Sequence, residues 1–322
     1  MLATYPADGQ GTATIGDAGV ACAAPTPDCA VPTDVAIELR FDRFLLPNSA
    51  LVAGLRLFTG DANGVSLSAR YDVIERVVVL QTGGRLHPNA LYTAEIVLAT
   101  DPSQGFWAFD GAPLEPGPVP LRFSFATGGG PVGASPDPST GASDDCVTLT
   151  APSQASAAPG PLNGCASCHK APPTAVGVAA EADYPPMGLV LTDWGLEHTA
   201  INRVAHETAI GNALDPGQQL GPRFGAQMNI VDPGAPERSY LMYKLLRKAD
   251  NYALGPDEPC PVSFHSPVSD GACVRPGDPE LARLGDRVVL GDPMPEAPLS
   301  ISRDDLVRVA NWIAAGALCH IP

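Results

Sequence analysis

Apolar and polar residues alternate with a period of two in the first part of the chain. Between positions 35 and 42 the apolar set is Val35, Ile37, Leu39 and Phe41, and the intervening set is Ala36, Glu38, Arg40 and Asp42. Because successive side chains of a strand point to opposite faces, this pattern predicts a half-buried strand with its charges on the other face.

Five similar apolar runs follow, separated by Gly, Pro, Asn and Asp. They are Leu55 to Phe58, Leu67 to Tyr71, Val77 to Leu80, Tyr92 to Leu98 and Leu121 to Phe125. Six or seven short strands within about 95 residues predict an antiparallel all-β sandwich over 33–128. Residues 1–32 read as a cysteine-containing lead-in segment, and 129–150 as a Gly/Pro/Ser linker.

Helical patterns occur in the rest of the chain. One helix is expected from Trp194 to Ala209. Another follows Ser302 and Asp305, which resemble a capping box, and ends near Gly316. Its apolar stripe consists of Leu306, Val309, Ala310 and Ile313.

The composition argues against a nucleic-acid partner and against a membrane-spanning segment. The formal net charge of −16 argues against nucleic acid, which requires clustered Lys and Arg. No run of 18 apolar residues occurs, so no membrane span is expected. Such a charge is usual for a solvated acidic surface, and it would also steer a basic redox protein toward the chain.

The strongest chemical pattern is Cys165-Ala166-Ser167-Cys168-His169. In CxxCH the two thiols bind a haem covalently and the histidine becomes the proximal iron ligand. A zinc site would need a second ligand pair at comparable spacing, and a thioredoxin-like site would follow a buried strand. A disulfide framework with a chance histidine is the third alternative.

Six cysteines remain once one haem c has taken two. We expect disulfides Cys22–Cys29, Cys260–Cys273 and Cys146–Cys319, with buried thiols as the alternative. An oxidising compartment follows, so the protein is expected to be exported, either periplasmic or associated with the outer membrane or cell surface. Residues 1–6 resemble no export signal, so we expect that a signal was removed, and a lipid anchor is compatible with this.

The sixth iron position decides the chemistry of a bound haem. Met294, between two prolines, is the best candidate for the distal ligand, because a thioether favours ferrous iron. The alternatives are Met228, Met187, a histidine such as His198 or His206, or a vacancy; Met242 is expected in the core. Arg203, Arg223 and Arg238 are candidates to pair with haem propionates or with surface carboxylates.

Two family resemblances are carried by particular residues. The run Ile37 to Phe41, the segment Leu86-His87-Pro88-Asn89-Ala90-Leu91-Tyr92 and the run Phe123 to Gly128 resemble the bacterial Ig-like domain of exported proteins. That resemblance implies an Ig-like sandwich over 33–128 and a tyrosine corner at Tyr92, with the ring in the core and the hydroxyl bonded to nearby backbone.

The haem motif, the later Met-Pro loop and the final helix ending Asn311-Trp312-Ile313-Ala314-Ala315-Gly316-Ala317 resemble class I cytochrome c over about 160–318. The segment 231–246 resembles a stretch of exported cytochrome c domains. The resemblance implies a mostly α mono-haem cytochrome c domain over 151–322, with an insertion at about 248–290 relative to the compact family. It also implies His169 and Met294 as axial ligands of the one haem. The chain departs from the compact family in the 125 positions that separate His169 from Met294, and in lacking the usual amphipathic first helix before Cys165.

Together these patterns predict a multidomain exported protein in which an Ig-like domain precedes a mono-haem c-type cytochrome that transfers single electrons and is not an enzyme. One alternative is a haem enzyme or sensor with an open sixth site, peroxidase-like or the electron-entry subunit of a dehydrogenase. A second CxxCH, a glycine-rich nucleotide loop, a GxSxG elbow and an HExxH helix are all missing from the sequence. Another alternative is a surface binding protein in which the Ig-like domain does the work.

Overall fold

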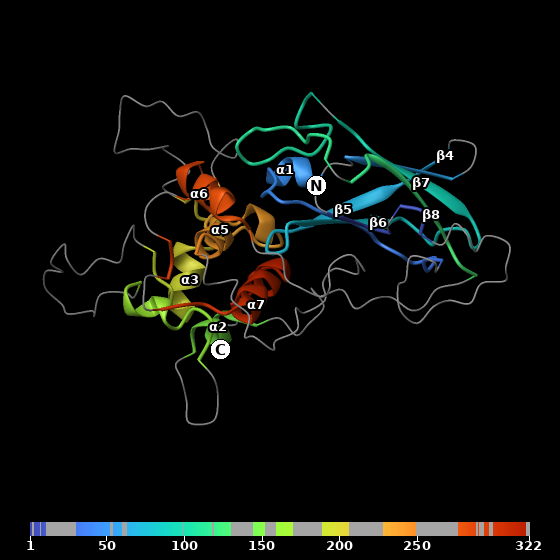
Figure 1. Ribbon diagram of the computed structural model, residues 1–322. Coiled ribbons are helices and arrows are strands. Elements are labelled where there is room, and N and C mark those ends of the chain that lie inside the picture. Colours follow the sequence, from blue (N-terminus) through green and yellow to red (C-terminus); the bar gives the residue numbers. More distant parts are fainter. Residues whose placement is uncertain are drawn as a thin grey trace, which may run out of the picture. The chain divides into compact units, whose positions relative to one another are not determined.

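The computed structural model describes residues 1, 3–6, 8–10, 30–51, 54–59, 63–98, 100–117, 119–129, 144–151, 159–169, 189–205, 228–248, 276–287, 289, 293–295 and 299–319. The chain divides into two compact units (Figure 1). The first comprises Met1–Asp137 and Glu258–Gly277, and the second Pro138–Asp257 and Asp278–Pro322.

Two antiparallel sheets build the first unit. Its elements are β1 (Ala3–Tyr5), β2 (Ile37–Arg40), α1 (Pro47–Ala50), β3 (Leu55–Thr59), β4 (Asn63–Val65), β5 (Leu67–Asp72), β6 (Val77–Thr82), β7 (Leu91–Ile96) and β8 (Arg122–Ala126). One sheet has the strand order β1-β2-β6-β5 and the other β4-β3-β7-β8. All six strand pairs within the sheets are antiparallel, as the sequence predicts.

All six strands that the sequence predicts are present, and β1 and β4 are additional. β1 lies inside the segment 1–32 and pairs with β2, where Tyr5 lies opposite Glu38. Two further contacts of this segment are parallel bridges, one from Gln10 to Phe125 of β8 and one from Val31 to Thr127, the residue after β8. The lead-in segment therefore contributes backbone to both sheets.

The prediction of a half-buried β2 is wrong, because the side chains on both of its faces are buried. Glu38 and Arg40 are each only 4% exposed. β2 is an inner strand between β1 and β6, and the Arg40 guanidinium lies 3.4 Å from the carboxylate of buried Glu75. Burial lowers the pKa of Arg40, and Glu75 opposes that effect. On the neighbouring strand, burial with the charge of Glu38 raises the pKa of Tyr5 to about 12.

Tyr92, near the start of β7, joins the core to the preceding loop. Its ring is 1% exposed and stacks on Phe125 at a centroid distance of 5.7 Å. Its hydroxyl accepts a 2.8 Å hydrogen bond from the backbone N–H of His87. The side chain of His87 is exposed, as expected for a residue before proline in a turn. The ring and the hydroxyl of Tyr92 thus both lie as the sequence predicts.

Short helices build the second unit. They are α2 (Cys146–Thr150), the 3₁₀ turn η3 (Cys165–Ser167), α3 (Asp193–Thr199), the 3₁₀ turn η7 (Pro236–Arg238), α5 (Tyr240–Leu246), α6 (Asp278–Arg287) and α7 (Arg303–Ala314). α2 packs against α3, and α7 packs against both α5 and η7. The helices bury apolar side chains that include Leu149, Leu196, Leu241, Met242, Leu245, Leu246, Leu284, Leu306, Val309, Trp312 and Ile313.

α7 confirms the predicted final helix at both ends. Ser302 Oγ accepts the N–H of Asp305 at 3.1 Å and donates to its carboxylate at 2.8 Å. At the other end Gly316 has a φ of +102° and donates to Ile313 O, while the N–H of Ala317 donates to Trp312 O. These two bonds form a Schellman motif, which a glycine in the left-handed region accommodates.

The helix expected from Trp194 to Ala209 is shorter than predicted, because α3 ends at Thr199. Asn202 follows with a φ of +55°, a left-handed conformation that does not continue a helix. The backbone N–H of Asn202 instead donates to Val231 O, so the chain after α3 pairs with a distant segment. Residues 206–209 lie outside the described part of the chain.

Cys146 and Cys319 form a disulfide with a Cα–Cα distance of 4.9 Å, which is the pairing expected from the sequence. Cys146 begins α2, which lies within the segment 129–150 expected to be a linker. The other two expected pairs, Cys22–Cys29 and Cys260–Cys273, lie outside the described residues. Among the helices that the structure describes, none is long and apolar enough to cross a membrane.

Candidate functional site

A single tight turn carries Cys165, Cys168 and His169. The carbonyl of Cys165 accepts the N–H of Cys168 at 3.2 Å and that of His169 at 2.9 Å. The turn is anchored on its N-terminal side, where fully buried Leu162 accepts from the N–H of Cys165 and itself donates to Leu149 O. The backbone thus places both thiols and the imidazole within one turn.

The imidazole of His169 is held in one orientation. Its Nδ1 lies 3.2 Å from the carbonyl oxygen of Leu189, and the N–H of Leu191 donates to the carbonyl of His169 at 2.7 Å. A carbonyl oxygen can only accept, so Nδ1 carries the proton and the lone pair of the neutral ring lies on Nε2. Metal-binding histidines commonly use one ring nitrogen in this way while the other binds the metal.

The two cysteines of the turn carry thiols rather than a disulfide. Cys165 is half-buried and Cys168 is exposed. Burial raises the pKa of the Cys165 thiol to about 11, so this group stays protonated at neutral pH. Desolvation is the larger effect on this thiol, and the charge of Cys168 acts in the same direction.

This donor set fits a covalently bound haem. Two thiols on one turn can form two thioether bonds, and the adjacent imidazole with its lone pair on Nε2 can serve as an axial iron ligand. Among the residues that the structure describes, no group of three or more His, Cys, Asp or Glu side chains converges as a metal site would require. On the turn itself, the side chains that could hold a haem are those of Cys165, Cys168 and His169.

Met294 is half-buried in the loop between α6 and α7. The ammonium of Lys248 donates to the carbonyl of Pro295 at 3.0 Å and also to that of Leu299. A Cβ atom added to Gly164 would lie 3.8 Å from the side chain of Leu299, so this loop reaches the residue that precedes Cys165. The role of Met294 as distal ligand stays a prediction.

The alternative ligands differ in their surroundings. Met242 is fully buried, which confirms the predicted core position, and Met228 is 7% exposed. His198 is exposed on α3. Met187 and His206 lie outside the described residues.

Two of the three candidate partners for propionates have protein contacts in the structure. Arg238 pairs with the carboxylate of Asp232 at 2.9 Å, and Nε of Arg203 donates to the carbonyl of His198 at 3.1 Å. Arg223 lies outside the described residues. For Arg238 the surface pairing that the sequence left open is therefore present.

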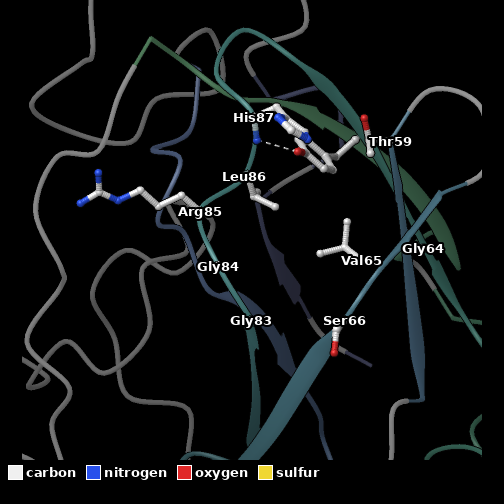
Figure 2. A pocket seen from close by; sticks show the side chains of 10 residues that line it. Thr59, Gly64, Val65, Ser66, Gly83, Gly84, Arg85, Leu86 and His87 are labelled. Atoms are coloured by element: carbon white, nitrogen blue, oxygen red, sulfur yellow. Dashed lines mark hydrogen bonds between the residues drawn. The ribbon is translucent and has the colours of Figure 1, made fainter.

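The first unit has a hollow of about 360 Å³ (Figure 2). It is lined by Thr59, Gly64, Val65, Ser66, Gly83, Gly84, Arg85, Leu86, His87 and Tyr92. In Figure 2 the side chain of Arg85 points away from it. The N–H groups of Gly83 and His87 already donate to Ser66 O and to the hydroxyl of Tyr92. These two backbone donors are therefore engaged within the protein.

Two groups at the site could not be found from the sequence. The acceptor for His169 is the backbone carbonyl of Leu189, which any residue type would supply. Lys248 follows α5, but its contacts lie 47 and 51 positions further along the chain. A local sequence pattern gives no signal for contacts over such a separation.

Comparisons with known proteins give no family. No protein-family model matches the sequence, and no curated protein matches it either. The chemistry of the described residues therefore carries the functional argument.

Proposed function

We propose that this protein is an exported mono-haem c-type cytochrome that carries single electrons. Cys165 and Cys168 would bind the haem covalently, His169 would be the proximal ligand and Met294 the distal one. The observation that carries the proposal is the hydrogen bond that Nδ1 of His169 donates to the carbonyl oxygen of Leu189. His169 lies on the same turn as both thiols. The hydrogen bond puts the lone pair on Nε2, the nitrogen that an iron ligand would use.

Haem c supplies reversible one-electron chemistry when bound. The residues of the chain would hold the iron environment constant between the two oxidation states. The bond to Leu189 orients the imidazole of His169 and raises its basicity. The thioether of Met294 favours the ferrous state and raises the potential. No substrate bond is made or broken in this function.

An Ig-like assignment of the first unit is supported by its strand order. If the strands are lettered in chain order as A, B, C, C′, D, E, F and G, the two sheets are A-B-E-D and C′-C-F-G. Ig-like sandwiches have this arrangement, and their tyrosine corner bonds a hydroxyl near the start of strand F to backbone just upstream, as Tyr92 does with His87. A role as spacer or docking module rests on this likeness of fold.

A class I-like cytochrome c assignment of the second unit is supported by the order of its parts. The thiol turn comes early, the Met294 loop comes late, and α7 follows that loop directly. The disulfide Cys146–Cys319 is typical of proteins in oxidising compartments, where haem is also attached to CxxCH. Export to the periplasm or the cell surface is consistent with both features.

Visible and near-infrared spectra of the oxidised and reduced holoprotein test the proposal. We expect sharp c-type bands in the reduced state and a weak sulfur-to-iron band in the oxidised state. Met294→Ala should remove the sulfur-to-iron band, whereas Met228→Ala should retain it.

The possible contrary results point in different directions. High-spin iron that binds carbon monoxide readily in the wild type would contradict the proposal of an electron carrier and would favour a haem enzyme or sensor. Loss of haem by acid–acetone extraction from the wild type would refute covalent attachment altogether.

A further inference from the structure

We propose that Arg247 and Lys248, at the end of α5, position the loop that carries Met294 and so set the strength of its bond to haem iron. The inference rests on the proposed function, because it needs Met294 as the distal ligand. The two residues hold chain segments on either side of Met294 in the sequence, with Val289 before it and Pro295 and Leu299 after it.

The helix that carries Arg247 and Lys248 at its end, α5, is fixed in the core. In α5 the side chains of Leu241, Met242, Leu245 and Leu246 are 4% exposed or less. The hydroxyl of Tyr243 donates to Glu237 O at 2.8 Å, and the N–H of Arg247 donates to Tyr243 O at 3.1 Å. Because α5 also packs against α7, the Cα atoms of Arg247 and Lys248 have a fixed position in the second unit.

Arg247 holds the segment before Met294. Its Nη1 donates to the carbonyl of Val289 at 2.9 Å, and Val289 is fully buried. The guanidinium also lies close to Gly285 of α6, where an added Cβ atom would come within 2.7 Å of Nε. The glycine therefore gives the guanidinium room to approach the helix backbone.

Lys248 holds the segment after Met294. Its ammonium bridges the carbonyls of Pro295 and Leu299, two residues four positions apart, and the first of them is bonded directly to Met294. An ammonium is a stronger donor than water or a neutral group, and it fixes both acceptors relative to one point. The main chain next to Met294 is thus tied to α5.

The same contact joins the loop to the haem-binding turn. Leu299, whose carbonyl binds Lys248, packs its side chain near Gly164, the residue before Cys165. A side-chain ligand whose backbone is held near the metal re-forms its bond to the metal readily after it dissociates. Loss of the Lys248 contacts should therefore weaken the hold of Met294 on the iron more than it weakens the fold.

Displacement of Met294 by imidazole, added to the oxidised full-length holoprotein, measures this effect. Lys248→Met removes the donor but keeps the length of the side chain. It should raise the apparent affinity for imidazole about tenfold, which corresponds to the loss of one hydrogen bond to a charged group. The sulfur-to-iron band should weaken and the midpoint potential should fall. Lys248→Arg, which can still donate to both carbonyls, should restore wild-type values.

A matched control separates this effect from a change in net charge. Arg56→Met removes one positive charge from the exposed face of β3 in the other unit and should leave the imidazole affinity unchanged. If Lys248→Met does not fold, Lys248→Gln, with a shorter neutral donor, should give an intermediate affinity. Imidazole affinities and sulfur-to-iron band intensities that are equal in the wild type, in Lys248→Met and in Lys248→Gln would overturn the inference.

The failure of the proposed function would look different. It would appear in the wild type itself, as covalent haem without a sulfur-to-iron band, before any change at Lys248 is made.

Discussion

The thiols of Cys165 and Cys168 are three positions apart and have different surroundings. Cys165 is half-buried beside the anchored end of the turn, while Cys168 is exposed. Because an acid that is raised in pKa by burial keeps its proton in the folded state, the reactivity of Cys165 in the haem-free protein should depend on pH.

In haem-free protein at pH 8, we expect iodoacetamide to alkylate Cys165 at least about tenfold more slowly than Cys168, because only the thiolate reacts. The rate at Cys165 should rise with pH toward its pKa of about 11. The single variants Cys165→Ala and Cys168→Ala assign each rate by mass spectrometry. Equal rates at pH 8 would show that the Cys165 thiol is not buried.

The same shift makes a prediction about stability. The unfolded chain releases this proton near the ordinary pKa of 9.0 and the folded chain near about 11. The folded state therefore binds more protons between these values, and its stabilisation by Cys165 is lost as the pH rises through that window. The Cys165→Ala variant should lack this loss in urea unfolding.

At the scale of elements, α7 begins at a side-chain cap that can be tested alone. Ser302→Ala removes the acceptor for the N–H of Asp305 and should lower the free energy of unfolding by about 1 kcal/mol. Ser300→Ala, two positions earlier at an exposed site, should change it by less than about 0.5 kcal/mol. Urea unfolding of both variants measures the difference, and equal effects would exclude a capping role for Ser302.

Elements with a regular period and clear ends could be predicted from the sequence. α7 has an apolar stripe, a capping serine and a final glycine, and β2, β3, β5, β6, β7 and β8 have apolar runs between turns. β1 and β4 are three residues long and have too few positions to show a period. Their place is set by pairing with β2 and β3, which is a tertiary contact.

Two elements differ from their local pattern because of long-range contacts. The charged face of β2 reads as exposed, yet it is buried with Arg40 paired to Glu75, which lies 35 positions away. α3 ends earlier than its composition suggests because the chain after Thr199 bonds to the segment around Val231. A pattern within one segment contains no information about either partner.

At the candidate site, too, some features follow from a local sequence pattern and others depend on long-range contacts. The spacing of Cys165, Cys168 and His169 is local, so the sequence alone identifies the motif. The tautomer of His169 depends on the backbone of Leu189, twenty positions later, and the support of the Met294 loop depends on Lys248. These contacts join segments that are distant in the sequence, so they can be identified only once the chain is folded.

At the scale of the whole molecule, the disulfide between Cys146 and Cys319 spans 173 positions of the chain. Closure of a loop this long restricts the unfolded state, so its removal should cost about 2–5 kcal/mol. We expect the double variant Cys146→Ser/Cys319→Ser to show that loss in urea unfolding. Added dithiothreitol should then lower the free energy of unfolding of the wild type by more than it lowers that of the double variant, and equal losses would place the stabilising bond elsewhere.

The disulfide also makes a covalent ring of the chain from Cys146 to Cys319, and this ring contains both the turn with Cys165, Cys168 and His169 and the Met294 loop. A protease that cuts the backbone once within the ring opens it without releasing a fragment. The nicked molecule would run as intact protein on a non-reducing gel and would keep both proposed iron ligands in one covalent unit. If the cut lies between His169 and Met294, only a reductant would then separate the fragment that carries Cys165, Cys168 and His169 from the fragment that carries Met294.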